Sequence, residues 1–331
     1  MNPRINLKHL EHLVLLADEL HFARAAERAC LSQSAFSRSI AAFEESVGLR
    51  LFDRGPRFVV PTADGKVVVA HARRFLSSST DLTRELALLR TGDLGEVVVG
   101  AGPFTAVTLM PRALAHLKRL HPSASVRLEV KSTLGLLQDL QDGRLDFFVA
   151  DTRDLPPSED WSVYSLGAFT GRLFCRAGHP LLSKKSLNLA DLRSQSFASV
   201  HLPGTVKLRL TRLLGIGDER TSPLALECEN LSALREYVLR SDVILIAPED
   251  AVRLELGTGS MVALKVKGLD ELGEKTPLVS VVAIIRMKDR TPTTATRALL
   301  DLVRREAKSI LVPPGRLTHL HDPRHFGKNP N

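Results

Sequence analysis

Residues 21–54 read HFARAAERACLSQSAFSRSIAAFEESVGLRLFDR, and this stretch decides how the first part of the chain folds. The segment 22–30 is rich in alanine, whose small side chains let another helix pack closely. A further helix is expected from Ser32 onward, because serine is a favourable N-cap and Ile40 and Phe43 fall on one apolar face. The opposite face of that helix is polar and carries Gln33, Ser34, Ser37 and Arg38.

Two short helices joined by a tight turn, the second with a free polar face, match helix-turn-helix geometry. On such a face Gln33 can bond bidentately to adenine and Arg38 can bind guanine or a phosphate, while serine hydroxyls can meet either. The alternative is a small helical bundle with a solvated polar face. Residues 1–60 hold eight Lys and Arg against seven Asp and Glu, so any attraction for DNA must come from local patterning.

The segments on either side extend this unit. Apolar residues recur at helical spacing from Leu7 to Leu20 and predict a preceding helix. Residues 49–62 combine a Gly-Pro turn with a short β-rich run and predict a hairpin, or wing. Three arginines of the wing are placed for backbone contact with DNA: Arg50, Arg54 and Arg57.

A heptad pattern follows the hairpin. Val68, Phe75, Leu82 and Leu89 recur every seven residues, and the second seam position holds Ala72, Ser79 and Leu86. The pattern predicts one long helix over 64–92 that pairs with a second copy through Val68, Ala72, Phe75, Leu82, Leu86 and Leu89. The alternative is a helix that lies on its own domain, which also shows an apolar stripe.

The composition changes at residues 91–95, where a linker is expected, and β-branched runs then alternate with helical stretches. Successive βαβ units predict a parallel sheet and a regulatory domain over 93–310, with lobe I at about 93–160 and 270–310 and lobe II at about 161–269. Two crossings between the lobes make a hinged cleft the expected result. The tail 311–331 is expected to be disordered; His319, His321 and His325 are more simply solvated than metal-bound.

Length, charge and cysteine content narrow the class of protein. The chain has 331 residues and a formal net charge of +8, which permits an anionic partner without naming one. No stretch has the roughly 18 apolar residues of a membrane span and no signal peptide is evident, so a cytoplasmic protein is expected. Three scattered cysteines support neither a disulfide framework nor a zinc site, and no cofactor or metal is predicted.

The first 90 residues resemble the N-terminal region of LysR-type transcriptional regulators. The resemblance rests on motifs in the same order and spacing: Phe22–Glu27, Leu31–Ile40, Phe43-Glu44, Gly48, Leu51–Arg54 and Thr62–Gly65. It extends to the family's effector domain through Gly100–Pro103, Leu109–Pro111, Gly143–Asp146 and Ile244–Pro248. The sequence departs from the family pattern at three positions. The family usually has Thr or Ser where Ala23 stands, Pro where Ser34 stands, and Leu where Pro61 stands.

The resemblance implies an N-terminal winged helix-turn-helix over 1–63, a dimerisation helix, and a C-terminal two-lobed α/β domain similar to periplasmic binding proteins. It implies DNA contacts from Ser32, Gln33, Ser34, Ser37, Arg38 and Arg54, and Ser32 can serve as a cap alone. The partners it implies are double-stranded DNA, a small-molecule effector in the cleft, RNA polymerase, and further copies of the chain in a homodimer or homotetramer.

Ligands of open α/β sheets gather at the carboxyl ends of strands and at helix N-termini. The residues that follow predicted strands are Gly102, Pro103, Phe104 and Thr105, then Ser132 and Thr133, then Asn230 and Ser232. Thr133 and Ser232 could equally be helix caps. Hydroxyls and helix ends suit a polar effector, with a small organic acid as one candidate, and Phe104 would cover a ring or an alkyl part.

Two other functions compete with this interpretation. An enzyme is suggested by VVVGAGPFT (97–105), which begins like a dinucleotide fingerprint, but Thr105 stands where the third glycine belongs and no catalytic motif is evident, so no catalysis is expected. A thiol redox sensor on the same scaffold would use Cys175 or Cys228, but both fall in predicted strands, where a buried and inert cysteine is commoner.

Overall fold

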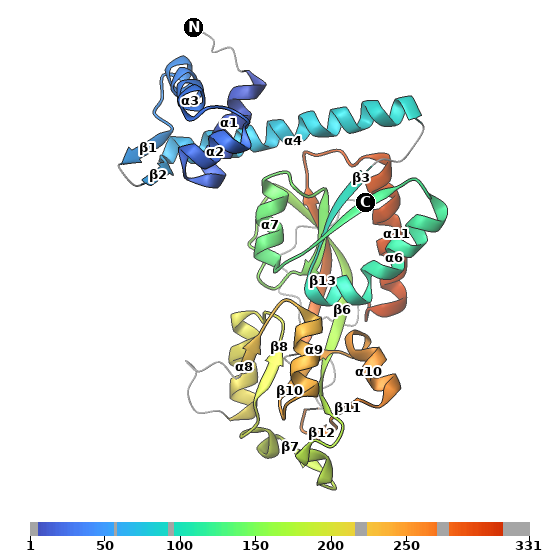
Figure 1. Ribbon diagram of the computed structural model, residues 1–331. Helices are drawn as coiled ribbons and strands as arrows, with labels where there is room; N and C mark the ends of the chain where they lie inside the picture. Colours follow the sequence, from blue (N-terminus) through green and yellow to red (C-terminus); the bar gives the residue numbers. More distant parts are fainter. Residues whose placement is uncertain (1–5, 56–57, 92–95, 216–223, 270–277, 314–331) are drawn as a thin grey trace. The chain divides into compact units, whose positions relative to one another are not determined.

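The computed structural model describes residues 6–55, 58–91, 96–215, 224–269 and 278–313 (Figure 1). The chain divides into two compact units, Met1–Asp93 with Asp139–Arg144, and the remainder. The tail from residue 314, with its three histidines, lies outside the described residues, as does Arg57. No helix within the described ranges is both long enough and apolar enough to cross a membrane.

The first unit begins with three helices, α1 (Leu7–Glu19), α2 (Phe22–Arg28) and α3 (Gln33–Val47). The N-cap of α3 is Ser32, whose hydroxyl accepts from the Ala35 amide at 3.3 Å. Gly48 ends α3 at φ +69°, a conformation that glycine adopts without the steric cost other residues meet. Phe36, Ile40 and Phe43 on one side of α3 are buried against α1 and α2, which leaves the predicted polar side outward.

The hairpin β1 (Phe52–Gly55) and β2 (Phe58–Pro61) follows, and then the long helix α4 (Ala63–Thr91). Part of the predicted dimer seam faces its own unit: Ala72 is 2% exposed and Val68 packs against the same core. The expectation that Ala72 pairs with a second copy is therefore wrong, because α1 covers this turn of α4. Phe75, Leu82 and Leu86 are 57%, 59% and 52% exposed, and the side chain of Leu89 lies outside the described set.

The second unit is built on one mixed sheet in the order β4-β3-β5-β13-β6-β10-β8-β9, with β11 beside β6. Lobe I holds β3 (Glu96–Ala101), β4 (Ser125–Val130), β5 (Phe147–Asp151) and β13 (Val279–Met287), with α5 (Pro103–Thr108), α6 (Met110–Leu120), α7 (Thr133–Gln141) and α11 (Thr294–Ile310).

Lobe II holds β8 (Phe197–Ser199), β9 (Leu224–Glu227), β10 (Ile244–Pro248) and β11 (Met261–Ala263), with α8 (Gly204–Leu214), α9 (Leu231–Leu239) and α10 (Arg253–Thr258). A small parallel pair, β7 (Leu187–Asn188) and β12 (Val266–Lys267), and three 3₁₀ turns, η1 (Pro180–Ser183), η2 (Leu189–Leu192) and η3 (Glu249–Val252), complete it.

The long strand β6 (Trp161–Arg176) belongs to both lobes. It pairs antiparallel with β13 through Trp161–Thr170 and with β10 through Gly171–Phe174. Strands β6 and β13 therefore run antiparallel to their neighbours, because the chain crosses from one lobe to the other and returns in the opposite direction. The parallel pairs β3–β4, β3–β5, β8–β9 and β8–β10 are those expected of βαβ units.

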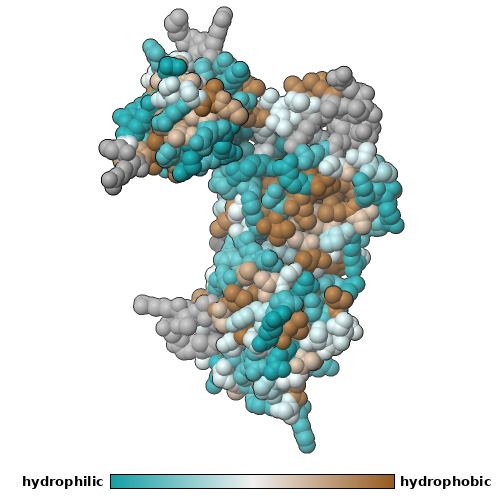
Figure 2. Space-filling model, viewed as in Figure 1, coloured by the Kyte–Doolittle hydropathy of each residue, from teal (hydrophilic) through white to brown (hydrophobic). Residues whose placement is uncertain are grey.

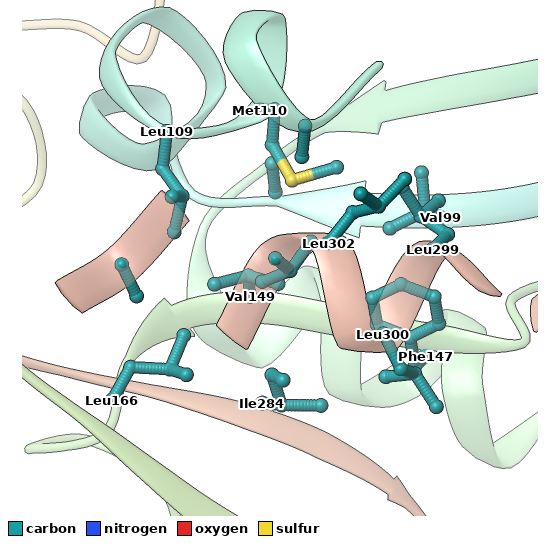
Figure 3. Packing of buried hydrophobic residues seen from close by; sticks show 14 of the residues in the cluster. Val99, Leu109, Met110, Phe147, Val149, Leu166, Ile284, Leu299, Leu300 and Leu302 are labelled. Carbon is teal, nitrogen blue, oxygen red and sulfur yellow. The ribbon is translucent and has the colours of Figure 1, made fainter. Parts of the chain in front are cut away.

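Each lobe has its own core. In lobe I, α6 and α11 pack on one face of the sheet, where Val99, Phe147, Val149 and Ile284 meet Leu299 and other apolar residues (Figure 3). In lobe II, α8 covers one face of the strands and α9 the other. Figure 2 shows hydrophobic surface gathered between α7 and α6 on the visible face of lobe I, beside the edge strand β4.

Candidate functional site

The exposed face of α3 offers two unoccupied polar side chains. Gln33 and Arg38 are exposed, and neither makes a hydrogen bond or an ion pair with any part of the chain that the structure describes. Ser37 is half-buried beside them, and the hydroxyl of Ser34 lies 3.3 Å from that of Ser32. An amide and a guanidinium on one helix face can donate to base edges or phosphates without first breaking an internal contact.

His12 of α1 contacts α3 on the side away from Gln33 and Arg38. His12 Nδ1 lies 2.7 Å from the Ser39 hydroxyl, and its ring packs against Phe36 at 5.1 Å between centroids. Burial, together with the neighbouring His9, lowers the pKa of His12, so the ring is neutral near pH 7. The contact holds α3 in place and leaves its outer face free.

Two arginines of this unit, one of them predicted to contact DNA, have internal partners. Arg54 pairs with Glu44, and its guanidinium lies 5.2 Å from the centre of the Phe22 ring. Arg24 bonds both the carboxylate and the backbone carbonyl of Glu19, at 3.1 and 2.6 Å. Arg54 thus joins the hairpin to the helices, and its predicted DNA contact would require sharing the guanidinium with Glu44.

A second candidate site lies in the second unit, between the lobes. Its cavity volume is about 220 Å³, below the low end of the roughly 300–1,000 Å³ of ordinary ligand sites, which favours a small or slender ligand. Its apolar lining is Pro103, Phe104, Leu134, Phe169, Val200, Leu202 and Pro203. Its polar lining is Thr105, Ser132, Thr133, Asp151, Arg153, Asp154, His201, Glu229 and Ser280.

Six of the predicted cleft residues line this cavity, but two of their hydroxyls are already engaged. Thr105 donates to the Val149 carbonyl at 2.7 Å and Thr133 donates to the Asp151 carbonyl at 2.8 Å. Among the described residues Ser132 accepts only a long bond, from the Gly135 amide at 3.4 Å, so its proton is available to a ligand. Asn230, which caps α9, and Ser232 are absent from the lining, and the neighbouring Glu229 takes their place.

Most of the charged residues that line the cavity were not predicted from the sequence. Asp151 accepts from the Arg153 side chain at 2.8 and 2.9 Å and from the Ser280 hydroxyl at 2.8 Å, so the cation and this carboxylate neutralise each other. Asp151 is the last residue of β5, and His201 lies two residues beyond β8, so the strand-end rule applied to every strand would have found both. Ser280 is placed by β13, which the sequence pattern did not connect with the cleft.

Cys175 and Cys228 differ in burial. Burial raises the pKa of the Cys175 thiol to about 11, which keeps it protonated and unreactive at neutral pH. Cys228 is half-buried and accepts from the Asn230 amide at 3.4 Å. Across the described ranges no three His, Cys, Asp or Glu side chains gather as a metal ion would require.

Comparison with known proteins matches both units. Residues 7–66 match the family model described as bacterial regulatory helix-turn-helix protein, lysR family, and residues 90–308 match the LysR substrate binding domain. The SDS degradation transcriptional activation protein of a Pseudomonas species is 39% identical over 301 residues, which cover 90% of this chain and 95% of that protein. The regulator CbbR of Xanthobacter flavus is 27% identical over 94% of this chain and 91% of its own length.

Solved structures agree in fold. Full-length CbnR complexed with its target DNA has a TM-score of 0.61 at 18% identity and covers 91% of this chain and all of its own. Full-length LysG of Corynebacterium glutamicum with bound effector Arg has a TM-score of 0.59 at 20% identity, covering 93% of this chain and all of its own. At these identities the likeness concerns the fold alone.

Proposed function

We propose that this chain, which belongs to the LysR family of DNA-binding transcriptional regulators, binds a two-fold symmetric operator through α3. The effector that we propose for its cleft is a slender, uncharged amphiphile. The function of the chain is transcriptional regulation by a DNA-binding unit joined to an effector-binding domain. The observation that supports the DNA-reading residues best is the pair Gln33 and Arg38, exposed and free of internal partners on the recognition helix.

A second copy of the chain is the proposed partner at α4. Phe75, Leu82 and Leu86 are large apolar side chains left exposed at heptad spacing, as a two-stranded seam requires. Exposed apolar residues on α5, α6 and β4, namely Val107, Leu120 and Val130, would suit a further subunit contact in a tetramer. Catalysis forms no part of the proposal.

The charge of the cleft bears on the effector. Asp154 and Glu229 line the cavity, while its one arginine is already bound by Asp151. An anionic head group would meet the negative potential of these carboxylates, whereas a hydroxyl could donate to one of them and accept from Ser132. The apolar wall with Phe104 and Leu134 suits an alkyl chain. The structure thus favours an alcohol over the organic acid that the sequence suggested.

The relative at 39% identity supports the same chemistry, because its name concerns activation of SDS degradation. Hydrolysis of an alkyl sulfate releases an alkyl alcohol, so the head groups to compare on one chain length are sulfate, hydroxyl and carboxylate. We therefore propose a medium-chain alcohol as the effector and activation of transcription as its result.

Titration calorimetry with 1-octanol, octyl sulfate and octanoate tests the effector class. We expect 1-octanol to bind most tightly and Leu134→Ser to weaken it about fivefold or more, as loss of an apolar contact with the alkyl chain implies. Leu254→Ser, at a 70% exposed leucine that does not line this cleft, is the matched control and should change nothing. Tighter binding of octyl sulfate or octanoate, or no binding of 1-octanol, would contradict the assignment.

A further inference from the structure

A single histidine bridges the two lobes at the cleft. His201 follows β8 in lobe II, and Asp154 follows β5 in lobe I. His201 Nε2 lies 3.5 Å from Asp154 Oδ2, and His201 Nδ1 lies 2.7 Å from Glu227 Oε1 on β9. Both His201 and Asp154 line the cavity. Because the two residues belong to different lobes, any movement of one lobe against the other changes the distance between them.

The protonation state of the ring decides whether both contacts can be made. At 2.7 Å from a carboxylate oxygen, Nδ1 must carry a hydrogen, because two acceptors would repel each other. In a neutral imidazole that hydrogen is the only one, so Nε2 would turn a lone pair toward Asp154. Only the imidazolium has a hydrogen on each nitrogen and can attract both carboxylates.

Of the two carboxylates that contact His201, Asp154 depends more on the charge of the ring. Glu227 has a second partner, Lys207 on α8, at 2.5 Å, whereas Asp154 makes no other ion pair or side-chain hydrogen bond with any residue that the structure describes. Burial raises the pKa of Glu227, but the bonds from Lys207 and His201 outweigh burial and hold it below its ordinary value. Glu229 and the neutralised Arg153 are the other charged groups that line the cleft.

We propose that His201 is a protonation-dependent latch between the lobes, closed while the imidazolium pairs with Asp154 and released when the ring loses its proton. Only the charged ring attracts Asp154, so the closed arrangement is favoured at lower pH and weakened at higher pH. A half-exposed ion pair shifts such an equilibrium by up to about fivefold. One consequence of the latch rests on the proposed effector role of the cleft: a ligand that prefers closed lobes binds more tightly at lower pH.

The closure can be measured without any ligand, which keeps this test separate from that of the effector. Spin labels at Arg297→Cys on α11 and Arg240→Cys at the C-cap of α9, both exposed, report the distance between the lobes by pulsed electron resonance. Cys30 and Cys228 are replaced by serine, and labelled chains are diluted with unlabelled chains so that only distances within one chain are recorded. Spectra are taken at intervals from pH 5.5 to 8.

The natural chain should show a single, narrow distance at pH 5.5 and a broader or longer distribution at pH 8. His201→Gln and Asp154→Asn should give the pH 8 distribution throughout, whereas His201→Lys, with a permanent charge, should stay narrow across the range. Asp154→Asn leaves the Glu227 contact intact and so isolates the contact between lobes. An unchanged distribution in the natural chain, or a pH response that survives Asp154→Asn, would overturn the proposal; failure of 1-octanol to bind would not affect it.

Discussion

Glu44 connects the recognition helix to the hairpin through one carboxylate. Its Oε1 accepts from the backbone amides of Leu51 and Phe52 at 2.8 and 3.1 Å, and its Oε2 pairs with Arg54. The side chain is only 14% exposed, so these partners replace water that it has lost. In the sequence Glu44 is an ordinary helix acid, because the amides it satisfies lie seven and eight residues away and meet it only after folding.

Replacing Glu44 by alanine should loosen the hairpin. Two backbone donors would lose their acceptor, which costs about 1–3 kcal/mol in the local opening free energy. Hydrogen exchange read by mass spectrometry over residues 49–62 should therefore quicken by roughly tenfold. Glu45→Ala removes an exposed carboxylate from the next position of α3 and should leave that exchange unchanged; equal exchange in the two variants would refute the connection.

Among the elements, α4 separates what a sequence pattern can predict from what it cannot. The heptad spacing predicted a single long helix, and the structure has one from Ala63 to Thr91. The spacing did not say which partner each turn meets, because a stripe that packs on its own domain has nearly the same period as a coiled-coil seam. The first turns pack Val69 and Ala72 into the core that α1 shares, whereas the later seam residues Phe75, Leu82 and Leu86 are exposed.

Leu82→Asp should dissociate the proposed dimer, because it places a charge in the middle of the apolar seam. Sedimentation velocity at micromolar concentration should find mainly monomer, with at least a tenfold weaker association than the natural chain. Ser78→Asp adds the same charge at an exposed position of α4 outside the predicted seam and should remain associated. Dissociation of both variants, or of neither, would argue against the seam.

At the scale of the whole molecule, the family resemblance and local periodicity predicted the order of domains and most elements. The antiparallel pairing of β6 with β13 was not predicted, because it is set by the crossing between lobes, which leaves no local pattern. In the cleft, apolar and hydroxyl residues next to strand ends were predicted, as with Phe104 and Ser132. The contact between Asp154 and His201 was not predicted, since it depends on how far the two lobes close.

The central claim is that α3 reads a specific DNA sequence, and footprinting of the purified protein on genomic fragments at about 150 mM salt tests it most directly, because weak backbone attraction is then screened. The natural chain should protect a discrete site with two-fold symmetry. Arg38→Ala should weaken that protection at least tenfold, as loss of one bidentate base contact implies, while Arg240→Ala, at an 80% exposed arginine that caps α9, should leave it intact. Diffuse binding that salt abolishes, or full protection by Arg38→Ala, would contradict it.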